Sequence, residues 1–183
     1  DSIARVEQLA EKVKADAAKQ TAVAAITDTA STLGLANDSA RTAARKQAFG
    51  DFAEASAGEN QTIVIENEVM KLNVSSKGGR IASVELKNYK TFDGKPLVLF
   101  TPDSSAQNLQ FTAYGKLFTT DSLYFTPEGI SFHVLDTASQ SLAMRLYAGN
   151  KAKYIEYVYT LKGNDYMMGF RVNVVGLQDI IAP

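Results

Sequence analysis

The chain has 183 residues, of which 45% are hydrophobic and 21% are charged, and its formal net charge at pH 7 is -1. This length supports about one domain, and the hydrophobic fraction excludes a fully disordered chain. With no Cys and one His, a disulfide framework, a thiolate zinc site and a cysteine nucleophile are excluded. The near-zero charge argues against nucleic acid as a partner, because such binding needs a basic excess.

The chain contains no apolar run long enough to cross a bilayer as a helix, which takes about 18 residues or more. Its N-terminal residues lack the positive region and apolar core of a signal peptide, and the first residue is not Met. We therefore expect a piece of a longer or processed chain.

Residues 1–60 are rich in alanine, which favours helices. A first helix is predicted over about residues 2–19 and a second over about 39–49. Asn37 or Asp38 would cap the second helix, and Gly50 would end it. A linker near residues 58–61 separates this helical lead, residues 1–60, from a predicted β domain, residues 61–183.

From residue 61 onward, Val, Ile, Leu, Phe and Tyr alternate with polar residues and are broken by Gly, Asn, Asp and Pro. Short alternating segments with regular turn signals are typical of a β-sandwich. We predict a mainly antiparallel sandwich that is preceded by the helical segment. Its strands are expected at 62–74, 80–87, 96–100, 109–113, 123–126, 130–135, 142–147, 154–161 and 166–175.

Two turns stand out. Gly78 and Gly79 join the first two predicted strands, and glycines adopt positive φ at low steric cost. Asp93 and Gly94 form the strongest turn signal that follows. The apolar run 96–100 comes next and predicts a strand buried on both sides.

Period-two alternation assigns the core faces of the last two strands. In 154–161, the apolar side chains share one face and leave Tyr154 outside it. In 166–175, a second apolar face is predicted to be core, while Arg171 and Asn173 point the other way. The two core faces consist of Ile155, Tyr157, Tyr159 and Leu161, and of Tyr166, Met168, Phe170, Val172 and Val174.

The sequence predicts no catalytic, cofactor-binding or metal-ligating residue. The single histidine, His133, lies opposite the apolar positions of its strand and is read as a surface residue. The Gly78-Gly79-Arg80 segment lies between two strands and lacks the helix N-terminus of a phosphate loop. As a groove or partner surface we select Arg80, Tyr154 and Arg171, which the predicted core leaves outside.

Residues 66–89, ENEVMKLNVSSKGGRIASVELKNY, closely resemble the opening of the large periplasmic domain of YidC-type membrane protein insertases. Residues 95–100 resemble the element that follows there, and residues 154–175 resemble a later hairpin. The order and spacing of these segments are more specific than any one of them. The resemblance covers about residues 62–175, and the sequence is most similar to those of members from Bacteroidetes-type bacteria.

This resemblance implies a β-supersandwich, here incomplete, in the periplasm at the bacterial inner membrane. Residues 1–60 would follow a first membrane helix, and a five-helix membrane core would lie elsewhere in the protein. The implied role is accessory and non-catalytic, in the insertion and folding of inner-membrane proteins. The implied partners are Sec translocon components and nascent membrane proteins, with membrane contact only through flanking helices.

Three further hypotheses stay open at this stage, and one of them is a purely structural spacer that supports the membrane core. The supersandwich is similar to sugar-processing mutarotase-like folds, so a carbohydrate- or peptide-binding module with a ligand cleft is the alternative. One His makes sugar epimerisation improbable, because that chemistry uses a histidine pair in such folds. An unpaired strand edge also predicts strand addition or an edge-to-edge homodimer.

Overall fold

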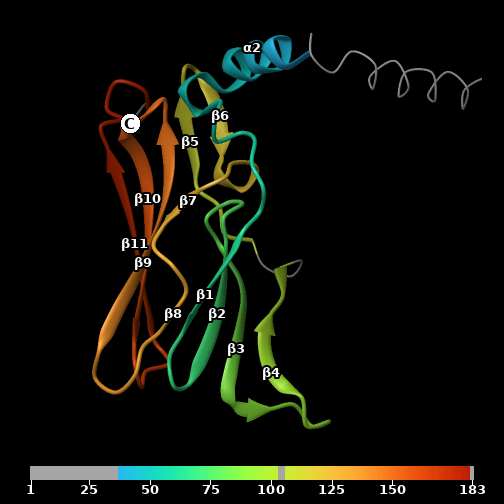
Figure 1. The fold of residues 1–183 in the computed structure, drawn as a ribbon, viewed down its shortest axis with the longest axis vertical. Coiled ribbons are helices and arrows are strands. Elements are labelled where there is room, and N and C mark those ends of the chain that lie inside the picture. The colour runs from blue at the N-terminus through green and yellow to red at the C-terminus, as the bar shows by residue number, and fades with distance from the viewer. Residues whose placement is uncertain (1–36, 103–105, 182–183) are drawn as a thin grey trace, which may run out of the picture. The chain divides into compact units, whose positions relative to one another are not determined.

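The structure is a computed structural model that describes residues 37–102 and 106–181 (Figure 1). The chain divides into two compact units, residues 1–44 and 45–183. The helix predicted over residues 2–19 lies outside the described residues. No helix of the described part is long and apolar enough to cross a membrane.

Helix α2 (Asn37–Phe49) confirms the second predicted helix. It continues into the 3-10 helix η1 (Gly50–Phe52). Gly50 has a φ of +57°, the left-handed conformation that commonly ends a helix. Residues 38–44 are exposed along α2. The predicted boundary near residue 60 remains a prediction.

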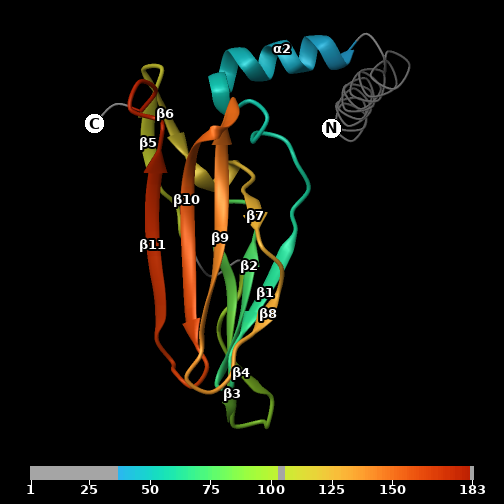
Figure 2. The ribbon, with the colours of Figure 1, turned by 60° about the vertical axis from the view of Figure 1, so that its left-hand side comes forward.

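Within residues 45–102 and 106–181, the strands form two facing sheets and a separate hairpin (Figures 1 and 2). The first sheet, in the order β4-β3-β2-β1-β8, contains β1 (Thr62–Glu66), β2 (Met70–Ser75), β3 (Ile81–Lys90), β4 (Pro96–Phe100) and β8 (Phe132–His133). The second, in the order β11-β10-β9-β7, contains β7 (Thr126–Glu128), β9 (Ser139–Ala148), β10 (Asn150–Lys162) and β11 (Met168–Val175). The hairpin is β5 (Gln110–Ala113) with β6 (Lys116–Thr119), and the 3-10 helix η3 (Thr120–Ser122) follows it.

The strand pairs in these sheets are antiparallel, apart from the parallel pair β1 and β8. The predicted mainly antiparallel β-sandwich is therefore confirmed. The short parallel contact joins Ile65 to Phe132 and Glu66 to His133.

The core lies between the inner faces of the two sheets. Every second residue of β10 points into it, and Ile155, Tyr157, Tyr159 and Leu161 are at most 2% exposed, as predicted. The hydroxyls of Tyr157 and Tyr159 form hydrogen bonds within this core, since a buried hydroxyl without a hydrogen bond is costly. Tyr159 donates to the Gly79 carbonyl at 2.6 Å and Tyr157 to the Thr120 hydroxyl at 3.2 Å.

The prediction of one strand over 62–74 was wrong, because the chain turns at Asn67. This side chain is fully buried. Its Oδ1 accepts the Val69 and Met70 amides at 3.0 and 2.7 Å. Its Nδ2 donates to the carbonyls of Lys162 and Asp165 at 2.6 and 2.8 Å. One Asn thus ends β1, starts β2 and ties both to the β10–β11 turn.

Strand β4 was wrongly predicted to be buried on both sides. It is the edge of its sheet and pairs only with β3, with irregular register. Val98 is 43% exposed and Leu99 is 55% exposed. A continuous apolar run is equally compatible with an edge strand, and the sequence offered no means of distinguishing the two.

The inner face of β11 is also more exposed than predicted. It does point toward the core, because the Phe170 ring stacks on Tyr159 with centroids 5.1 Å apart. However, β11 is the outermost strand of its sheet. Phe170 is 45% exposed, Val172 39% and Val174 52%. The alternation therefore predicted correctly that these side chains point inward, but wrongly that they are buried.

Candidate functional site

The Gly78-Gly79 turn packs against the core. Gly78 and Gly79 have φ values of +80° and +62°. A Cβ on Gly79 would lie 2.7 Å from the Phe125 ring, too close for any other residue. The Gly79 carbonyl also accepts the Tyr159 hydroxyl. The Gly78 and Gly79 amides donate to the carbonyls of Leu123 and Ser76 at 2.8 and 3.3 Å, so neither amide is available to a phosphate.

The Asp93-Gly94 turn lies at the tip of the β3–β4 hairpin. Gly94 has a φ of +82°, and the Thr91 amide donates to the Lys95 carbonyl at 2.9 Å. Asp93 forms an ion pair with Lys95 at 2.7 Å and accepts the Thr91 hydroxyl. The hydrogen bonds from Lys95 and then Thr91 lower the pKa of Asp93.

The structure does not bring the three predicted surface residues together. Arg80 lies in the turn between β2 and β3, and both its terminal nitrogens donate to the Pro102 carbonyl at 3.1 Å. Tyr154 and Arg171 share the outer face of the second sheet, where Tyr154 pairs with Val175 and Arg171 with Val158. Tyr154 is half-buried, and Arg171 is exposed.

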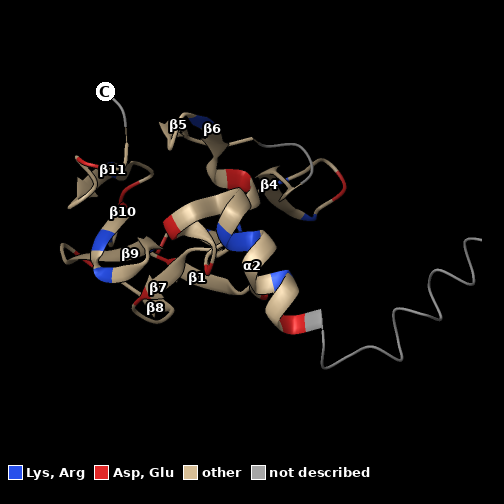
Figure 3. Cartoon of the chain, turned by 90° about the horizontal axis from the view of Figure 1, so that it is seen from above, with Lys and Arg blue, Asp and Glu red and all other residues tan. Residues whose placement is uncertain are grey.

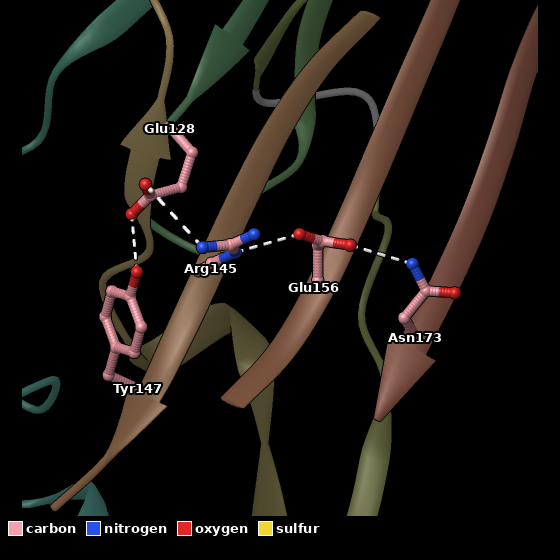
Figure 4. Close-up of polar contacts among 5 residues, drawn as sticks. All are labelled: Glu128, Arg145, Tyr147, Glu156 and Asn173. Carbon is pink, nitrogen blue, oxygen red and sulfur yellow. Dashed lines mark hydrogen bonds and ion pairs between the residues drawn. The ribbon is translucent and has the colours of Figure 1, made fainter. Parts of the chain in front are cut away.

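A polar row crosses the outer face of the second sheet near Tyr154 (Figure 4). Arg145 of β9 donates from Nε to Glu156 of β10 at 2.8 Å, and its Nη1 lies 3.7 Å from Glu128 of β7. Asn173 of β11 donates to the other Glu156 oxygen at 2.8 Å. Tyr147 donates to Glu128 at 2.5 Å. Four strands are thereby joined by charge-assisted contacts.

The row shifts the pKa of its members in the directions expected for paired charges. The contacts with Tyr147 and then Glu156 raise the pKa of Arg145. Burial opposes the charged form of Glu156, but the hydrogen bonds from Asn173 and Arg145 outweigh it and lower its pKa. The Arg145 guanidinium also lies 4.5 Å from the centre of the Tyr154 ring, a cation–π contact.

The sequence did not indicate this row, although period-two alternation placed Arg171 and Asn173 on the outward face. The missing signal was the pairing of opposite charges at outward positions of neighbouring strands. Arg145 faces Glu156 directly in the β9–β10 register, and Glu156 faces Asn173 in the next. Such pairs become recognisable only once the register is known.

The described surface contains hollows of ligand size. One, of about 450 Å³, lies between residues 54–61 and the second sheet, and its walls include Tyr124, Pro127 and Tyr147. A polar one of about 320 Å³ lies beside Arg80, Lys77 and Asp121. Another, of about 380 Å³, opens beside β11, and its mainly apolar walls include Leu109, Phe111, Leu117, Ile155, Val174 and Ile181.

Charges elsewhere are mixed in sign (Figure 3). His133 is exposed, as predicted. Among the described residues no group of three or more His, Asp or Glu is placed to hold a metal ion. The absence of nucleic acid as a partner remains a prediction.

Two sheets around one core define a β-sandwich. The profile of the family described as "YidC periplasmic domain" matches residues 62–179. The chain belongs to this family. It thus contains sequence of a periplasmic domain at the bacterial inner membrane, as the resemblance predicted.

Curated relatives with the name "Membrane protein insertase YidC" agree with this assignment. That of Parabacteroides distasonis is 37% identical over 149 residues, which are 80% of this chain and 22% of the relative. That of Porphyromonas gingivalis is 36% identical over 152 residues, covering 82% and 23%. That of Azobacteroides pseudotrichonymphae is 38% identical over 125 residues, covering 68% and 19%.

The chain therefore spans about a fifth of the length of the curated relatives that it matches. No solved structure matches the chain.

Proposed function

We propose that this chain is part of the periplasmic domain of a membrane protein insertase and acts there as an accessory element. It assists the insertion and folding of inner-membrane proteins by contacting Sec translocon components or segments of client proteins. Family membership supports the insertase context. The contact itself is proposed from the structure of β11.

The observation that carries this proposal is the open edge of β11. This strand of eight residues pairs with β10 alone among the described strands, so one side of its backbone lacks a neighbouring strand. Its inner face is apolar and partly exposed at Phe170, Val172 and Val174. The apolar hollow of about 380 Å³ opens beside the same face.

An extended segment added beside β11 would use both features. Its backbone would continue the ladder of the second sheet, and its alternate apolar side chains would cover the inner face of β11. Backbone hydrogen bonds supply affinity in this mode, and side-chain pockets supply specificity. The fitting partner is therefore an extended segment with apolar residues at every second position.

Fluorescence anisotropy with labelled peptides tests this mode. The panel contains alternating apolar segments of inner-membrane proteins and scrambled versions of the same composition. We expect the alternating peptides to bind more tightly. The Val172→Lys variant should weaken binding at least about tenfold, because an inward-pointing charge blocks an edge.

The matched control is Val175→Lys, the same substitution on the outer face of the same strand. It should leave binding within about twofold of the unaltered chain, an energy change well below 1 kcal/mol. Equal loss in the two variants, or equal affinity for alternating and scrambled peptides, contradicts strand addition at β11. Pull-down of translocon subunits with the same variants then separates the two kinds of partner.

We further propose that this part of the protein is non-catalytic. The support is indirect: the relatives are named as insertases. Turnover of any sugar by the purified chain would refute this. The alternative of a carbohydrate- or peptide-binding module is tested at the hollow beside Tyr124 and Tyr147, where oligosaccharide binding lost in Tyr124→Ala would favour it.

A further inference from the structure

Two neighbouring turns at one end of the sandwich expose large apolar side chains. Asn88 of β3 donates to the Tyr166 hydroxyl at 3.4 Å, and the rings of Tyr89 and Tyr166 are 6.0 Å apart. The β3–β4 turn and the β10–β11 turn therefore lie side by side. Together they form what we term the aromatic tip: Tyr89 (51% exposed), Phe92 (105%), Tyr166 (46%) and Met167 (75%).

Phe92 is the most exposed of the four side chains. The β3–β4 turn projects at the end of its hairpin (Figures 1 and 2). The Thr91–Lys95 backbone hydrogen bond and the Asp93–Lys95 ion pair fix its conformation. An aromatic ring held fully in water on a fixed turn costs free energy until a partner covers it.

The segment that carries Phe92 has an excess of positive charge, although carboxylates from other segments lie close to it. Residues 87–95 contain three Lys and one Asp, whereas the whole chain has a net charge of -1. Lys87 pairs with Glu66 and Lys95 with Asp93. Lys90, in contrast, has no ion pair in the described part of the chain. The neighbouring turn adds one carboxylate, Asp165, which accepts the Met167 amide.

We propose that the aromatic tip docks on the anionic lipid surface of the membrane. A ring flanked by Lys and Tyr matches the membrane–water interface, where aromatic rings sit at headgroup level and Lys attracts anionic lipids. The family acts at the inner membrane, so such a surface is close by. This contact adds to the one expected through flanking helices and is independent of the β11 edge.

Because the chain has no Trp, a Phe92→Trp variant carries a single fluorescent reporter in the tip. It is titrated with vesicles of phosphatidylethanolamine and phosphatidylglycerol, and with neutral phosphatidylcholine vesicles. We expect a blue shift and protection from a soluble quencher with the anionic vesicles. The control is Leu117→Trp, an exposed apolar position in the β5–β6 hairpin at the other end of the sandwich, which should show neither.

Vesicle sedimentation of variants tests the cause. Phe92→Ala should lower binding at least about tenfold, because it removes a ring that the interface would bury. Lys90→Gln should lower it about fivefold at low salt and very little at high salt. Both positions are exposed, so folding should be unaffected, as circular dichroism can verify.

Two results overturn the proposal. The first is absence of binding to anionic vesicles, which would point to a protein partner for the tip. The second is binding that Phe92→Ala leaves unchanged. Neither affects the proposed function, because peptide binding at β11 is measured without lipid.

Discussion

At the scale of the single residue, the Asn67 side chain connects separate parts of the fold in a way that its sequence context does not indicate. All four hydrogen bonds of its side chain run to backbone groups, from two segments almost 100 positions apart. We predict that Asn67→Ala lowers the free energy of unfolding by about 3 kcal/mol, because buried backbone groups lose their partners. Urea denaturation measures this loss.

Asn60→Ala provides the matched control. The Asn60 Oδ1 also accepts several hydrogen bonds, from Ser75, Ser76 and Lys77, but this residue is exposed. Water replaces it there, so the loss should stay below about 1 kcal/mol. Equal losses in the two variants would show that burial is not what makes Asn67 important.

Glu156 gives the second residue-scale prediction, one of pH dependence. Its pKa is lowered in the folded state. A lowered carboxyl pKa contributes stability above the unfolded-state pKa, and this contribution disappears as the pH falls through the folded value. Glu156→Gln should therefore cost stability at pH 7 and flatten the decline below about pH 4.5, the ordinary value.

Urea denaturation from pH 7 to pH 3 measures the Glu156 effect, with the exposed Glu68→Gln as control. The control should run parallel to the unaltered chain throughout. A Glu156→Gln curve that also stays parallel would show that the polar row does not stabilise the folded state.

At the scale of the element, the sequence predicted well where a strand was long and clearly alternating. The strands β9, β10 and β11 appear where they were expected. Each has one face toward the core, so its apolar residues recur at every second position. Prediction failed where one side chain redirects the backbone, as at Asn67, and where pairing decides burial, as in β4. Strand β6 was missed, although β5, which has the same length, was predicted.

Strand β11 yields the element-scale prediction. Phe170→Ala should cost only about 1–2 kcal/mol, because the ring is 45% exposed despite its contacts with Tyr157 and Tyr159. Phe52→Ala is the matched control. Phe52 is fully buried against Phe111 and Phe118, and its loss should cost about 3–5 kcal/mol. Equal costs would mean that the inner face of β11 is covered.

At the scale of the whole molecule, the sequence indicated the surface residues but not their grouping. Tyr154 and Arg171 share one face of the second sheet, whereas Arg80 lies in a turn of the first sheet. Only the strand order shows that Arg80 lies apart from the other two. The same limit concealed the aromatic tip, since Tyr89 and Tyr166 are 77 positions apart and meet through the packing of two turns. Family resemblance gave the class of protein, and the surfaces required three-dimensional structure.

The open edge of β11 also predicts how whole chains meet. We propose an antiparallel edge-to-edge homodimer with Val172 opposite its own copy, because this register places Arg171 opposite Asn173. The adjacent register would set Arg171 against Arg171, and like charges directly opposite each other are unfavourable. Sedimentation velocity should show dimers that increase with concentration and disappear in Val172→Lys.

A peptide that adds to β11 and a second copy of the chain require the same backbone groups. Excess alternating peptide should therefore convert the dimer to a peptide-bound monomer, while its scrambled version should leave the dimer intact. A chain that stays monomeric at high concentration would refute the homodimer and leave peptide binding to be judged by anisotropy. A dimer that keeps its size with bound peptide would place its interface elsewhere, on an element other than β11.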